Sequence, residues 1–170
     1  MQPLYLLTAV DVRRATQPGS SRATIISKMA IPAIKFITAE HNPGGGVMAV
    51  DFAQPRIEKV EPAFEVKGFD TDIFGGMGEV ERWTFAGSVR DKKTGKAQPA
   101  RAVIEGAITE WTPDEASPTE FVGCNHAIKE VTHYEFWLNG VELWYSDFWE
   151  RILRRGGVDL FAEDRRALGA

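Results

Sequence analysis

The stretch YEFWLNGVELWYSDFW, residues 134–149, constrains the fold more than any other part of the sequence. Two runs of aromatic and aliphatic residues flank the dipeptide Asn139-Gly140. A two-residue type I′ turn needs positive φ at both central positions, and Asn-Gly tolerates that conformation best. The stretch therefore predicts a β-hairpin.

The simplest register of this hairpin sorts its side chains onto two faces. One face is expected to face the core, and it holds the cross-strand pairs Leu138 with Val141, Phe136 with Leu143, and Tyr134 with Tyr145. The other face holds the pairs Trp137 with Glu142 and Glu135 with Trp144. Large aromatics on both faces predict a second covering layer, either from the same fold or from another subunit.

Short alternating apolar and polar runs, broken by Gly, Pro, Asn and Asp, make up most of the chain. This pattern is typical of antiparallel β-structure and predicts an all-β dominated fold with one or two short helices. The expected strands are 4–13, 23–30, 33–39, 47–52, 63–67, 81–90, 100–111, 122–138 and 141–148.

Two short helices are expected between these strands and at the end of the chain. One is a single turn near Asp70 to Phe74. The other spans 159–168, with Asp159 as its N-cap and two arginines in its last turn. The segment 148–156 is compatible with a helix started by Asp147 and equally with a continued strand.

The 170 residues fit one domain. Residues 22–111 form a first β-rich half that includes a Gly-rich loop at 40–47. An exposed loop at 112–120 follows, and residues 121–148 form a long strand and the hairpin. The three consecutive glycines of the first loop cannot hold one conformation without outside contacts.

Composition and charge exclude several classes of protein. The net charge of −4 argues against stable nucleic-acid binding, which needs a dense basic patch, although it allows DNA to pass without being trapped. The lone Cys124 excludes an internal disulfide. The apolar runs are too short or interrupted to cross a bilayer, and the N-terminus does not match a signal peptide, so no membrane association is expected.

No catalytic, cofactor or metal site is expected. His41, His126 and His133 fall into no HExxH pattern and no nucleophile-and-base series. Cys124 and His126 share one strand face, which would make half a zinc site with no second half, so a half-buried strand is the preferred interpretation. Neither glycine cluster fits a phosphate-binding loop.

The C-terminal stretch, residues 133–170, resembles the end of the major tail tube proteins of contractile-tailed temperate phages. The hairpin part of the resemblance is carried by Tyr134, Phe136, Leu138, Asn139, Gly140 and Leu143. The terminal part is carried by Gly157, Val158, Asp159, Phe161, Glu163, Arg165, Leu168 and Gly169. Weaker collinear similarity extends upstream through KMAIPAIK, AEHNPGGGVMAVDF and VKGFD to about residue 23.

This resemblance implies a structural protein with an antiparallel β-sandwich or β-barrel tail-tube fold. Such a protein forms homohexameric rings that stack into the inner tube of a phage tail, around the tape measure protein and later the passing DNA. The implied partners are further copies of itself and the sheath, baseplate and tail-terminator proteins. It is located in the virion tail, and in the host cytoplasm during assembly.

Two alternatives to a phage tube stay open. The tube of a contractile bacteriocin or of a type VI-like injection machine has related sequence features. A small β-barrel enzyme or ligand-binding domain is the alternative from a different class.

The resemblance suggests residues for each kind of contact. Stacking between rings is expected at Glu40, His41, Asn42, Pro43, Gly44, Gly45, Gly46 and Val47, and at Arg165 and Arg166. Trp137 and Trp144 are expected to join neighbours within a ring, unless they belong to the core of their own subunit. The lumen candidates are Glu105, Glu110, Glu130 and Glu135, and a register slip of one residue would turn each away.

Overall fold

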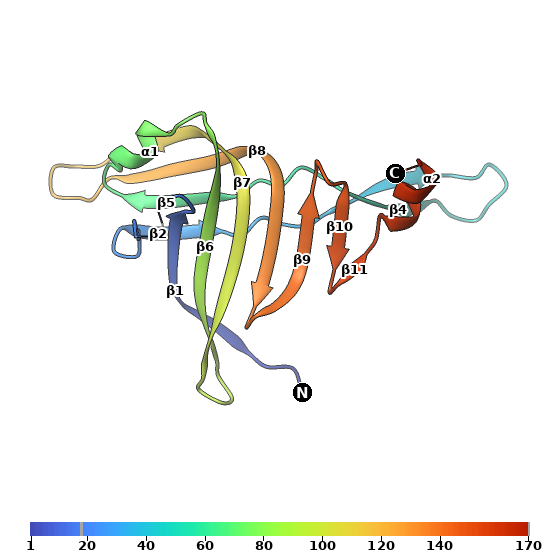
Figure 1. The fold of residues 1–170 in the computed structure, drawn as a ribbon, viewed down its shortest axis with the longest axis horizontal. Coiled ribbons are helices and arrows are strands. Elements are labelled where there is room, and N and C mark those ends of the chain that lie inside the picture. Colours follow the sequence, from blue (N-terminus) through green and yellow to red (C-terminus); the bar gives the residue numbers. More distant parts are fainter. Residues whose placement is uncertain (18, 170) are drawn as a thin grey trace.

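The computed structural model describes residues 1–17 and 19–169 (Figure 1). Its strands are β1 (Tyr5–Arg14), β2 (Ile26–Ala30), β3 (Phe36–His41), β4 (Val50–Ile57), β5 (Ala63–Lys67), β6 (Val80–Asp91), β7 (Ala97–Pro113), β8 (Gly123–Leu138), β9 (Val141–Asp147), β10 (Ile152–Arg155) and β11 (Val158–Asp159). Its helices are α1 (Thr71–Gly75) and α2 (Ala162–Ala167). The all-β dominated fold with two short helices is therefore confirmed.

The strands form two open antiparallel sheets. The large sheet has nine strands, seven of them in the order β1-β6-β7-β8-β9-β10-β11, with β5 paired to β8 and β2 paired to β5. Strands β3 and β4 pair only with each other and extend to one side of the body as an arm (Figure 1). The turn between β6 and β7 lies at the bottom of the same view, close to the N-terminus.

Strand β8 bends the large sheet into two layers. Its first half pairs with β5 and its second half with β9, and the β7–β8 register shifts between Glu105 and Ala107 and again between Ile108 and Glu110. Gly106 sits at the first shift, where a Cβ atom would lie 2.8 Å from the Lys129 carbonyl oxygen. Only glycine fits there without displacing the backbone.

The core lies between these two layers. Its buried apolar side chains come from β1, β5 to β10 and α1: Val12, Phe64, Val66, Ile73, Trp83, Phe85, Ala102, Ile104, Ile108, Cys124, Ile128, Tyr134, Trp144 and Leu153. Cys124 and His126 both point into this core, and the His126 ring stacks on Phe64 at 4.9 Å. Burial lowers the pKa of His126 and raises that of Tyr134 to about 12.

Two buried arginines attach α1 to the sheet. The guanidiniums of Arg14 and Arg22 lie 5.2 and 5.5 Å from the ring centroid of Trp83. Arg22 also bonds the carboxylates of Asp70 and Asp72 at 2.6 and 2.7 Å. The single helical turn expected near Asp70 to Phe74 is present as α1, and Asp70 is its N-cap.

The Asn139-Gly140 turn is confirmed, but the expected hairpin register beyond it is wrong. Both turn residues have positive φ, 49° and 77°. The register shifts between Phe136 and Trp137, so Phe136 pairs with Trp144 instead of Leu143. A bulge adds one residue to β9, and every later side chain of that strand changes face.

The C-terminal segment also differs from the expectation. Helix α2 begins three residues later than predicted, and Phe161, without a side-chain cap, stands at its N-cap position. Asp159 instead ends β11, where its Oδ1 accepts a bond from the Phe161 N–H at 3.0 Å. Asp147 accepts the Glu150 N–H at 2.8 Å, but a turn and then β10 follow. Neither alternative for 148–156 is right, because β9 ends at Asp147, a turn follows, and a separate strand, β10, spans Ile152–Arg155.

Candidate assembly surfaces

The face of the large sheet that points away from the core carries a hydrogen-bonded polar set. His133 lies at its centre, with its Nε2 2.7 Å from Glu135 Oε1 and its Nδ1 2.9 Å from Asp147 Oδ2. The Tyr145 ring packs edge-on against the imidazole at 5.1 Å. His133 and Glu135 thus share a face, as strand alternation predicts.

Arg154 extends this set onto β10. Its guanidinium donates two hydrogen bonds to the Glu142 carboxylate, one of 2.8 Å from Nη2, and stacks over Tyr145 at 4.2 Å. The bond from Arg154 lowers the pKa of Glu142. Burial raises the pKa of Asp147, but the bonds from the Glu150 N–H and His133 outweigh it and lower the pKa. The charges of this face are therefore largely paired within the chain.

The structure brings only two of the four lumen candidates to this face. Glu105 lies opposite His133 and pairs with Arg82 at 3.0 Å, and Glu135 lies one row further along β8. Glu110 lies beyond the second register shift, in the other layer. Glu130 occupies the bulge, with φ of 54°. Alternation along the sequence cannot show these shifts, because they arise from pairing with a distant strand.

The two tryptophans of the hairpin lie on opposite faces. Trp144 is 4% exposed and packs edge-on against Phe36 in the core of its own subunit, which is the alternative interpretation of this residue. Trp137 lies on the outward face, where its Nε1 donates to Glu135 Oε2 at 2.7 Å. Trp137 lines a shallow pocket with Pro99 and is the hairpin tryptophan available at the surface.

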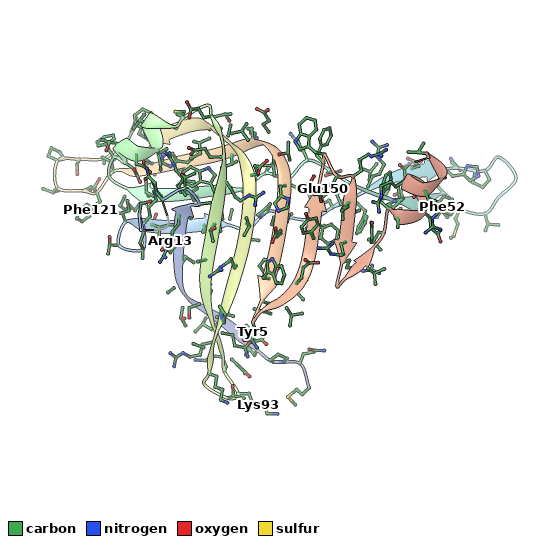
Figure 2. All side chains as sticks on the ribbon, in the orientation of Figure 1. Tyr5, Arg13, Phe52, Lys93, Phe121 and Glu150 are labelled. Carbon is green, nitrogen blue, oxygen red and sulfur yellow. The ribbon has the colours of Figure 1, made fainter. Side chains whose placement is uncertain are left out.

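The arm carries most of the stacking candidates. Glu40 and His41 end β3, and residues 42–47 lie in the glycine loop. The loop and the adjoining strand expose large apolar side chains, with Val47 fully exposed, Met48 67% and Phe52 57%. Figure 2 shows Phe52 far from the body of the sheet.

The first strand carries an exposed apolar surface that the sequence patterns did not single out. Strand β1 is an edge strand paired only with β6. Leu4, Tyr5, Leu6 and Leu7 are all exposed, and they point to both faces of the ribbon because successive side chains alternate. The apolar run near the N-terminus was visible in the sequence. It did not predict an exposed edge, because a buried strand has the same short apolar run.

Helix α2 lies beside the base of the arm. Phe161, just before the helix, lines an apolar groove of about 410 Å³ together with Ile57 and Val60. Arg165 is held by Asp159 at 2.7 Å and by the Arg151 carbonyl at 2.8 Å, whereas Arg166 is exposed. The two arginines therefore differ, and Arg166 is the one that extends into solvent.

Two kinds of feature, metal sites and membrane-spanning helices, do not occur in the described part of the chain. Within 1–17 and 19–169, no group of three His, Cys, Asp or Glu side chains is arranged to hold a metal ion. No helix in this part of the chain has the length and apolar character needed to cross a membrane. The geometry instead consists of open sheet edges, an arm and exposed apolar side chains, which is typical of a protein that assembles with other copies or partners.

Comparisons with known proteins agree with this class. The chain belongs to the family described as phage tail tube protein FII, whose model matches residues 14–169. No curated protein sequence matches the chain. The fold is shared with a chain of the anti-feeding prophage baseplate, solved by cryo-electron microscopy with six-fold symmetrisation. The TM-score is 0.52 at 7% identity, over 81% of this chain and 94% of that chain, so this likeness concerns the fold alone.

Proposed function

We propose that this protein forms hexameric rings that stack into the inner tube of a contractile phage tail. The family match over residues 14–169 carries the proposal. The tube would enclose the tape measure protein, conduct DNA during ejection, and contact sheath, baseplate and tail-terminator proteins. It would act as a structural protein without catalysis, made in the host cytoplasm and located in the virion tail.

The outward face of the large sheet suits the wall of the lumen. Six copies would complete a barrel from strands β6 to β9, with Glu105 and Glu135 on the inner surface. These acids are paired with Arg82 and His133, so the wall combines both signs of charge. The negative charge of Glu105 and Glu135 lowers the gain that DNA would obtain from counterion release at this wall, which keeps the passing polymer mobile.

The joint within a ring would be heterologous, because a six-fold ring needs two different complementary surfaces on each subunit. The exposed β1 edge is one suitable surface, since its unpaired backbone groups can bond a strand of the neighbouring subunit. Trp137 is a candidate on the lumen face. Trp144, being buried in its own subunit, would support the joint only indirectly.

Electron microscopy and analytical ultracentrifugation of the purified protein test this proposal. Rings of six subunits and tubes are expected as concentration rises. A wild-type protein that stays monomeric at high concentration, even with tail components added, would contradict the proposal.

A second candidate is the tube of a contractile injection particle that carries no genome. The fold shared with the anti-feeding prophage baseplate chain supports this second candidate. Purified native particles distinguish the two, because a phage tail is attached to a DNA-filled capsid and an injection particle is not.

A further inference from the structure

The arm contains an unfavourable charge arrangement that its own subunit does not relieve. Glu40 on β3 lies directly opposite Asp51 on β4. Directly opposed residues in an antiparallel pair are close neighbours, and two like charges there destabilise the ribbon. Within the described chain neither carboxylate forms a salt bridge, although 14 such pairs occur elsewhere. Both side chains are exposed.

The turn between β6 and β7 has the opposite charge. Arg90, Lys92, Lys93 and Lys96 are exposed, and none of them forms a salt bridge with any described residue. The one acid of the turn, Asp91, is 7% exposed and already accepts bonds from the Lys93 N–H at 2.8 Å and the Thr94 hydroxyl at 3.0 Å. The turn is therefore a cationic surface without a partner.

Each of these charged surfaces adjoins exposed apolar side chains. On the arm these are Val47, Met48 and Phe52. Beside the turn they lie at the start of the chain, where Leu6 of β1 pairs with Arg90 and the carbonyl of Leu4, just before β1, accepts the Lys92 N–H at 2.9 Å. The two surfaces lie at different extremes of the molecule in Figure 1, so one subunit cannot bring them together.

We propose that the acidic arm tip of one subunit docks on the β6–β7 turn and the start of β1 in a second copy of this chain, in the adjacent ring of the tube. This rests on the tube function proposed above. The turn lies at the end of long strands β6 and β7, and where those strands form the barrel wall that end faces the next ring. Docking places unpaired acids near unpaired cations and covers both apolar patches.

Charge swapping tests this contact. Glu40→Lys with Asp51→Lys, and separately Lys92→Glu with Lys93→Glu, should each leave rings intact and lower the mass of sedimenting tubes by about tenfold or more, because like charges then repel across the contact. All four substitutions on one chain should restore tubes. Glu115→Lys with Glu120→Lys, an equal charge change on the exposed loop after β7, is the control and should leave tubes at wild-type yield.

The outcomes separate this inference from the tube function. If the wild type and both charge-reversed variants form tubes equally well, this inference is overturned and the tube function is not. The same holds if the variant with all four substitutions still forms only rings. Loss of rings as well as tubes in a variant with a wild-type melting temperature would place the contact within a ring and also overturn it. A wild-type protein without rings or tubes would overturn both proposals.

Discussion

The β8–β9 hairpin and the β3–β4 arm are both antiparallel strand pairs, but their side chains are satisfied in opposite ways. The first buries Tyr134 and Trp144 in the core and closes with a two-residue turn. The second exposes Phe52, opposes Glu40 with Asp51, and closes with a glycine loop. An isolated two-stranded ribbon is marginal in water. The difference indicates that the hairpin stabilises its own subunit, whereas the arm leaves apolar and charged side chains exposed for the contact proposed above.

Truncation of one aromatic in each ribbon should give the largest contrast. Trp144→Ala removes a buried ring and should lower the free energy of unfolding by about 3–5 kcal/mol. Phe52→Ala removes an exposed ring and should change it by no more than about 0.5 kcal/mol, while reducing tube formation. Denaturant unfolding of unassembled protein measures both. Equal losses of stability would show that the arm is part of the folding core.

The two turns should respond differently to the addition of a methyl group. Gly140 has φ of 77°, so Gly140→Ala forces a left-handed alanine and should cost about 1–2 kcal/mol. A Cβ on Gly44 or Gly45 meets no atom within 4 Å. The double replacement of these two by alanine should therefore leave unfolding within about 0.5 kcal/mol of wild type but impair stacking of rings. If that variant forms tubes of normal length, the hypothesis that the glycine loop contacts the adjacent ring is wrong.

The dependence of the unfolding free energy on acidic pH should differ between a carboxylate that is paired in the folded chain and one that is not. Hydrogen bonds from Lys67 and Ser27 lower the pKa of the Glu65 carboxyl from 4.5 to about 2. The unfolded chain then takes up this proton first, so the contribution of Glu65 to stability is complete above about pH 4.5 and is lost as the pH falls toward 2. Glu65→Gln should flatten the fall in unfolding free energy across that window.

Glu115→Gln is the matched control for this pH series, because Glu115 is exposed on the loop after β7 and forms no salt bridge with a described residue. Its slope between pH 4.5 and 2 should equal that of the wild type. A slope changed as much as in Glu65→Gln would contradict the assignment of the acid sensitivity to the Glu65 contacts.

The last contrast concerns Trp137, on the outward face of the hairpin. Trp137→Phe removes the Nε1 bond to Glu135 and should cost about 1 kcal/mol of unfolding free energy. Trp137→Ala removes the outward-facing indole as well. If that indole lies in the joint between subunits, this variant should form fewer hexamers in sedimentation experiments. Unchanged ring formation would limit Trp137 to a role within its own subunit.

Much of the strand order in sequence was predictable, since alternation and turn residues are local signals. The expected strand 63–67 coincides with β5, and the strands on both sides of the Asn139-Gly140 turn end within one residue of prediction. The helical turn after Asp70 also follows from local capping. Less of the assembly surface was predictable, because exposure of Leu4 to Leu7 depends on where β1 pairs and on what covers it.

The sequence by itself determined the features that depend on a few adjacent residues: the two-residue turn at Asn139-Gly140, the antiparallel class and the glycine loop between β3 and β4. Only the tertiary structure decided which side chains share a face. The register shift before Trp137 moved Trp144 into the core, and the bend of β8 placed Glu105 and Glu110 in different layers. A bulge inverts the faces of a strand beyond it, and it forms where distant strands must pair around a packed core, which no local pattern records.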